Sequence, residues 1–184
     1  MTAYTRAVLA LGSNLGARRD TLSAAVAGIV DSAAVRLRDV SPVVRTKAVG
    51  GPENQPDFLN MVMEVDTTLD PYQLLALCQS VEKTHLRTRE VRWGPRTLDV
   101  DIITYGDRRS ADPVLTLPHP RAAQRAFVLY PWAVMDPTAE LDGVPVAELA
   151  AAAADMDTLQ PFVEEGPGDD GGASFAGDEQ AQAH

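Results

Sequence analysis

Cysteine is almost absent from this chain, since Cys78 is the only one in 184 residues. A disulfide within the chain is therefore excluded, and the apolar helical surroundings of Cys78 predict a buried thiol rather than a nucleophile. The sequence also lacks an apolar run long enough to cross a bilayer, and residues 1–6 lack the charged and apolar regions of a signal peptide. These absences predict a cytoplasmic protein with no membrane partner.

Basic residues are also few, because 16 Lys and Arg face 26 Asp and Glu and give a formal net charge of -10. A domain that binds nucleic acid normally carries a basic patch or stripe. Here the bases concentrate only between Lys83 and Arg96. We therefore expect no nucleic-acid partner, and a small polyphosphate suits this cluster better.

The acidity is concentrated at the end of the chain. Residues 164–184 hold six acids and no Lys or Arg, so removing them leaves 26 - 6 = 20 acids against 16 bases, a net charge of -4. This segment has almost nothing to bury, which predicts a disordered, solvating tail, with an acidic interaction tail as the alternative. Residues 1–163, in a chain that is 45% hydrophobic, are expected to form one monomeric domain.

The segment richest in chemical groups is Arg92-Trp93-Gly94-Pro95-Arg96-Thr97-Leu98-Asp99-Val100-Asp101. Successive side chains of a strand alternate between its faces, so a strand that begins at Leu98 places Asp99 and Asp101 on one face, about 6.5 to 7 Å apart. Carboxylates are typical Mg²⁺ ligands, completed by water and substrate phosphates, and the upstream arginines could neutralise phosphate charge. The segment predicts phosphoryl transfer from a nucleotide.

A plainer interpretation is that the two aspartates form the solvated face of an ordinary strand and pair with surface arginines. Aspartate is a poor strand former, however, and here two stand among Leu, Val, Ile and Tyr. The Gly94-Pro95 pair also restricts the backbone of the preceding loop, which suits a loop that must present its side chains reproducibly.

Hydrophobic periodicity predicts an α+β protein with a ferredoxin-like core. The expected order is β-α-β-β-α-β: a strand at residues 7–11, a helix opening at Asp20, a strand at residues 35–46 with an edge or bulge at Pro42, a strand at residues 58–68, a helix from Asp70-Pro71 to about His85, and a strand at residues 98–105. Additional short C-terminal helices are expected at residues 122–132 and 146–154, packed on the sheet.

Two segments are expected to lie outside regular structure. Residues 47–57 are too rich in Gly and Pro for a helix or strand, and a long loop in a compact domain is often functional. Gly12-Ser13-Asn14 does not fit a phosphate-binding P-loop, which needs Gly-x-x-x-x-Gly-Lys-Ser/Thr, so we interpret it as a structural turn.

Four motifs occur together in one order: Leu11-Gly12-Ser13-Asn14-Leu15-Gly16, Gln55-Pro56-Asp57-Phe58-Leu59-Asn60, the block from Arg92 to Asp101, and Pro118-His119-Pro120 with Arg125 and Phe127. On these residues the chain resembles 6-hydroxymethyl-7,8-dihydropterin pyrophosphokinases, from about Thr5 to about Leu141. The resemblance implies transfer of pyrophosphate from ATP to the hydroxymethyl group of the pterin, with release of AMP, in folate biosynthesis.

The resemblance also implies roles for single residues. Asp99 and Asp101 would hold two Mg²⁺ ions, and the catalytic arginines would be Arg87 and Arg96. The pterin would be bound by Thr46, Phe58, Asn60, Trp93 and Phe127. ATP would be bound by Gln79, Glu82, Arg89, Arg92, Thr116, His119 and Arg125. The chain departs from the family pattern at Ala48, close to a position where proline is common, and at Val114, where some members have arginine.

Alternatives remain for several of these residues. Core packing is the alternative for Phe58, Phe127 and Trp93, a solvated helical face for Gln79 and Glu82, and a surface position for His119 and for each arginine. For the whole chain, the alternatives are a non-catalytic ferredoxin-like binding module and a kinase that moves only the γ-phosphate.

Overall fold

The computed structural model describes residues 3–14, 17–47, 55–85 and 98–162. Its helices and strands follow the expected order, with short additions near the C-terminal end. They are β1 (Thr5–Ser13), α1 (Arg18–Val30), β2 (Val35–Val40), β3 (Val44–Thr46), β4 (Phe58–Thr67), α2 (Pro71–His85), β5 (Asp99–Tyr105), β6 (Ser110–Asp112), β7 (Leu115–Leu117), η1 (Ala122–Gln124), α3 (Ala126–Met135), β8 (Glu140–Leu141), β9 (Val144–Pro145), α4 (Val146–Ala152), η2 (Met156–Thr158) and β10 (Leu159–Pro161).

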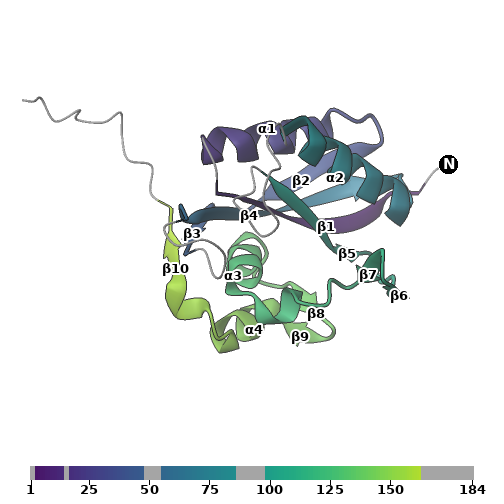
Figure 1. Ribbon diagram of the computed structural model, residues 1–184. Helices are drawn as coiled ribbons and strands as arrows, with labels where there is room; N and C mark the ends of the chain where they lie inside the picture. Colours follow the sequence, from purple (N-terminus) through teal and green to yellow (C-terminus); the bar gives the residue numbers. More distant parts are fainter. Residues whose placement is uncertain (1–2, 15–16, 48–54, 86–97, 163–184) are drawn as a thin grey trace, which may run out of the picture.

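The main sheet is antiparallel and has the strand order β10-β3-β4-β1-β5, with β2 also paired to β4. This order places the first strand of the predicted core between the third and the fourth, which is the ferredoxin-like arrangement. Helices α1 and α2 cover one face of the sheet, and α3 and α4 lie on the other (Figure 1). The predicted α+β ferredoxin-like fold is confirmed.

Each face of the sheet has its own hydrophobic core, because side chains alternate along β1 and β4. Leu9, Leu11 and Met63 pack under α1 and α2, whereas Val8 and Val62 pack under α3 and α4. Most residues of the two central strands, β1 and β4, are buried between these two cores. In the described part of the chain, none of the helices combines the length and apolarity needed to cross a bilayer.

Helix α2 begins as its sequence predicts. Asp70 Oδ1 accepts the backbone N–H groups of Tyr72 and Gln73, both at 2.9 Å, and Pro71 occupies the first helical position. Helix α1 instead begins at Arg18, so Asp20 lies in its first turn and does not open it. The expected start was therefore wrong by two residues.

The expected strand at residues 35–46 is in fact two strands, β2 and β3, which both pair with β4. The interruption falls at Pro42, where an edge or bulge was expected. Ser41 bridges the break, since its backbone N–H donates to the Val62 carbonyl at 2.8 Å and its hydroxyl accepts the Val62 N–H at 2.8 Å. The hydroxyl oxygen of Ser41 thus takes the place of the backbone carbonyl that would accept the Val62 N–H in an unbroken strand pair.

Two further expectations were wrong. Gly12 and Ser13 belong to β1 and pair with β4, so the Gly12-Ser13-Asn14 segment is not simply a turn. Pairing on both sides overrides the turn preference of these residues. The helix expected at residues 122–132 is divided into η1 and α3 by Arg125, whose backbone is extended.

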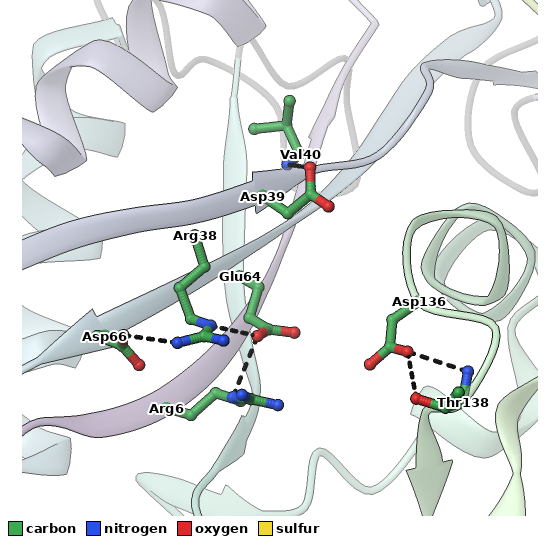
Figure 2. Close-up of polar contacts among 8 residues, drawn as sticks. All are labelled: Arg6, Arg38, Asp39, Val40, Glu64, Asp66, Asp136 and Thr138. Atoms are coloured by element: carbon green, nitrogen blue, oxygen red, sulfur yellow. Dashed lines mark hydrogen bonds and ion pairs between the residues drawn. The ribbon is translucent and has the colours of Figure 1, made fainter.

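On the α3 side of the sheet, a charged cluster surrounds Glu64, which is only 7% exposed. Glu64 Oε1 lies 3.1 Å from Arg6 Nε and 2.8 Å from Arg38 Nε, and Arg38 Nη1 lies 2.9 Å from Asp66 Oδ2 (Figure 2). Hydrogen bonds to Asp66 and Glu64 raise the pKa of Arg38. Arg6 and Arg38 thus compensate the charge of the buried Glu64 carboxylate. Glu64 lies four residues after Asn60 on β4.

Candidate active site

Asp99 and Asp101 lie on the same face of β5, as the sequence predicts. Val100 and Ile102 point into the core under α1 and α2, whereas Ile103, which shares the phase of the aspartates, packs with the α3 core. Both aspartates are half-buried, and they stand beside Gly12 and Ala10 of β1, respectively. The paired carboxylates therefore face the α3 side of the sheet, next to its central strands.

His119 is tied to the same strand, because its backbone N–H donates to the Ile103 carbonyl at 2.8 Å. Burial lowers the pKa of the His119 imidazole; the Asp101 carboxylate opposes this, and Arg125 and Arg121 add to it. The Arg121 backbone N–H donates to His119 Nδ1 at 3.2 Å. In the neutral imidazole the proton is therefore on Nε2, which leaves an N–H donor for a ligand.

Arg125 is a half-buried cation near the carboxylates. Burial lowers its pKa, and the Asp101 carboxylate is the strongest opposing influence. Its guanidinium carbon lies 5.5 Å from the centre of the Phe127 ring. Asp155 Oδ1 accepts the Ala126 backbone N–H at 2.9 Å and so caps the start of α3 directly after Arg125. The break that divides the expected helix thus positions a cation beside the acids.

The amide of Asn60 is fixed from the neighbouring strand. Asn60 Nδ2 donates to Thr46 Oγ1 at 2.9 Å, and the two residues are 6% and 7% exposed. Phe58 lies two residues from Asn60 on the same face of β4, and half-buried Phe127 comes from α3, which packs against β3 and β4. The structure therefore groups the four described residues that were predicted to bind the pterin.

The three remaining described residues predicted to bind ATP are more dispersed. Glu82 is half-buried and its Oε1 accepts the Val100 backbone N–H at 2.8 Å, so it contacts β5 between the two aspartates. Gln79 is exposed on α2. The hydroxyl of Thr116 donates to the Asp112 carbonyl at 3.0 Å within the β6-β7 hairpin.

Five predicted site residues lie outside the described residues: Arg87, Arg89, Arg92, Trp93 and Arg96. The predicted acidic tail lies outside them too. Within residues 3–14, 17–47, 55–85 and 98–162, no three His, Cys, Asp or Glu side chains gather as a metal site.

The sequence analysis missed a connection between the β1-α1 junction and the start of β4. Asn14, which is fully buried, donates from Nδ2 to Gln55 Oε1 at 3.3 Å, and Arg18 Nη1 donates to the Asp57 carbonyl at 2.5 Å. Both partners belong to the motif that leads into Phe58 and Asn60. The two motifs occur together in the sequence, which could have suggested that they interact, but only the fold shows that they are in contact.

The fold and this site define the class of the protein: an α+β domain that carries paired carboxylates, basic side chains and a buried amide on one face of an antiparallel sheet. The model of the 7,8-dihydro-6-hydroxymethylpterin-pyrophosphokinase family matches residues 8–137. The chain therefore belongs to this family, and the resemblance recognised from its motifs is confirmed.

Individual relatives agree with the family model. A Bacillus subtilis protein named 2-amino-4-hydroxy-6-hydroxymethyldihydropteridine pyrophosphokinase is 47% identical over 127 residues, which cover 69% of this chain and 75% of the relative. A Pseudomonas aeruginosa protein of the same name is 43% identical over 148 residues, covering 80% and 91%.

A solved structure shares the fold. A Plasmodium falciparum HPPK-DHPS variant crystallised with pterin and p-hydroxybenzoate matches with a TM-score of 0.67 over 88% of this chain. This chain spans 48% of that longer one, and the identity is 12%. At this identity, the likeness supports the fold alone.

Proposed function

We propose that this protein transfers pyrophosphate from ATP to the hydroxymethyl group of 6-hydroxymethyl-7,8-dihydropterin and releases AMP, as a step of folate biosynthesis. The observation that carries the proposal is the position of Asp99 and Asp101 on the face that also presents the Asn60 amide. One group suits a metal-bound triphosphate and the other a flat heterocycle with hydrogen-bonding edges, so the two substrates can lie side by side.

The donor set at Asp99 and Asp101 fits Mg²⁺, which takes oxygen ligands and often only one or two carboxylates. When bound, Mg²⁺ would neutralise triphosphate charge and hold the reacting groups in register. The two half-buried carboxylates supply the negative charge that such a site needs. The number of ions, two, remains a prediction from the resemblance.

His119 and Arg125 suit the triphosphate. The Nε2–H group of His119 and the guanidinium of Arg125 would donate to phosphate oxygens, and their partial burial strengthens such charge-assisted contacts. Arg89 and Arg92 are proposed to add further ATP contacts. Gln79, Glu82 and Thr116 are proposed to lie toward the nucleotide.

The pterin is proposed to stack between Phe58 and Phe127, with its polar edge against Asn60 and Thr46. Offset stacking of each aromatic pair contributes about 0.5–1.5 kcal/mol. Trp93 is proposed to bind the pterin as well. One N–H of Asn60 Nδ2 is held by Thr46, which fixes the direction of the amide, and Asn60 Oδ1 would accept a hydrogen bond from a pterin N–H group.

In the reaction, the pterin hydroxyl oxygen forms a bond to the β-phosphorus of ATP, and the bond from that phosphorus to the oxygen bridging to the α-phosphate breaks. AMP leaves with the electron pair of that bond, and the proton of the pterin hydroxyl is released to water. Catalysis of this kind consists mainly of alignment and electrostatic stabilisation. Arg87 and Arg96 are proposed to stabilise the charge that moves to the leaving group, and no nucleophilic side chain is required.

The direct test incubates the protein with ATP, Mg²⁺ and 6-hydroxymethyl-7,8-dihydropterin and identifies the products by chromatography. AMP and a pterin diphosphate are expected. ADP and a pterin monophosphate would identify a γ-phosphate kinase, and unchanged substrates would favour a binding module. Cytoplasmic location, a monomeric state and the absence of a nucleic-acid partner stay predictions from the sequence.

The metal assignment is tested with Asp101→Asn, which keeps the side-chain size and removes its charge. Turnover should fall about a hundredfold or more, because metal sites supply several kcal/mol of charge stabilisation. The matched control is Asp107→Asn, on the exposed turn that follows β5. Equal turnover of Asp101→Asn and wild type would remove Asp101 from the metal site.

A further inference from the structure

Gly12 lies in the central strand of the site, opposite Asn60 of β4 on one side and Asp99 of β5 on the other. A Cβ atom at this position would lie 2.7 Å from Asn60 Oδ1, which is shorter than real Cβ contacts. Gly12 does not have the positive φ found at Gly106 and Gly143, which are at 50° and 77°. Glycine is therefore needed at position 12 for space rather than for backbone conformation.

The Asn60 amide has little freedom to move away from such a Cβ. Its Oδ1 and Nδ2 belong to one planar group, so a displacement of Oδ1 rotates Nδ2 as well. Nδ2 is held by Thr46 Oγ1 at 2.9 Å, and the side chain is 6% exposed. A methyl group at position 12 would therefore break or strain the bond to Thr46 and turn the amide away from its present direction.

A glycine inside a strand normally weakens it, because glycine gives the unfolded chain extra freedom and offers no side chain for packing. Ala10, two residues earlier on the same face of β1, shows that a methyl group fits between β4 and β5 when the neighbour is Val62 and not Asn60. The missing Cβ therefore coincides with the side-chain amide of Asn60 on the neighbouring strand.

We infer that Gly12 is a positioning residue for pterin recognition: the space over its Cα lets the Asn60 amide lie across β1 and present Oδ1 to the heterocycle. The inference rests on the proposed function. It adds the prediction that the size of residue 12 controls the affinity for the pterin but not the affinity for ATP.

The test is Gly12→Ala, with steady-state kinetics in which each substrate is varied separately. KM for 6-hydroxymethyl-7,8-dihydropterin should rise about fivefold to fifteenfold, the equivalent of one misdirected hydrogen bond, and KM for ATP should change less than about twofold. The matched control is Gly28→Ala in α1, where a Cβ would meet only Val81 side-chain atoms at 3.4 Å and beyond. This control should leave both KM values unchanged.

A double-mutant cycle separates positioning from a general structural effect. With Asn60→Ala the proposed obstacle is absent, so adding Gly12→Ala should cause no further loss of pterin affinity, and the double variant should fold even if the single one does not. Additive losses, a parallel rise in both KM values, or an unchanged pterin KM in Gly12→Ala would each overturn the inference. If wild type formed no AMP, the proposed function would fail first, and that result is distinguishable from these.

Discussion

Replacing Thr46 by valine should both destabilise the protein and weaken pterin binding, because it removes the acceptor that holds the Asn60 amide. Valine keeps the branched shape of threonine and lacks the hydroxyl. Thr46 and Asn60 are 7% and 6% exposed, so Asn60 Nδ2 would lose its 2.9 Å partner where water has little access. Leaving a buried donor unpaired costs about 1–3 kcal/mol.

The magnitude can be followed in two assays. The free energy of unfolding from urea titration should fall by about 1–3 kcal/mol, and Tm should fall by roughly 2–4 °C for each kcal/mol in a domain of this size. KM for the pterin should also rise by roughly threefold to tenfold, because the amide is no longer aimed.

Thr46→Ser is the matched control, since it keeps the hydroxyl and removes one methyl group, at a cost of about 0.8 kcal/mol. The reasoning predicts that the serine variant retains the pterin KM of wild type and the valine variant does not. If the two variants were equal in pterin KM, the hydrogen bond would have no role in aiming Asn60. If the valine variant were as stable as wild type, the amide would have another buried partner.

Two further predictions concern α2. Asp70→Ala should lower the free energy of unfolding by about 1 kcal/mol in urea titration, because two backbone N–H groups lose their cap, whereas Asp70→Asn should retain most of that stability. Burial raises the pKa of the Cys78 thiol to about 12, so the folded protein should resist alkylation by iodoacetamide at mildly alkaline pH, and rapid modification of the folded state would contradict this.

The sequence predicts best those features that a single strand or helix determines by itself. The phase of β5 fixes the shared face of Asp99 and Asp101, and the phase of β4 sets Asn60 opposite Leu59 and Met61. The cap at Asp70 similarly requires only its own next residues. Local periodicity and local hydrogen bonding carry this information, and the fold preserves it.

Features that depend on pairing between distant segments could not be predicted in the same way. Gly12 and Ser13 have the composition of a turn, yet their registers with β4 and β5 keep them in a strand. β10 has only three residues and exists by pairing with β3. Arg125 stands in an apolar helical pattern, but the cap from Asp155, 30 residues later, coincides with an extended backbone at this position.

The two faces of the sheet explain why the described polar residues Asn60, Asp99 and Asp101 lie on one side of it. One face is closed by α1 and α2 over a continuous apolar core, so it offers no place for charged substrates. On the other face, α3 and α4 enclose a smaller core, and polar groups remain on the strands at Asn60, Asp99 and Asp101. β1 lies between the strands that carry these groups, so the proposed pterin and triphosphate sites are neighbours across it. The residues of β1 on this face, Ala10 and Gly12, are small and project little between the two proposed sites, and close approach is what direct transfer between two bound substrates requires.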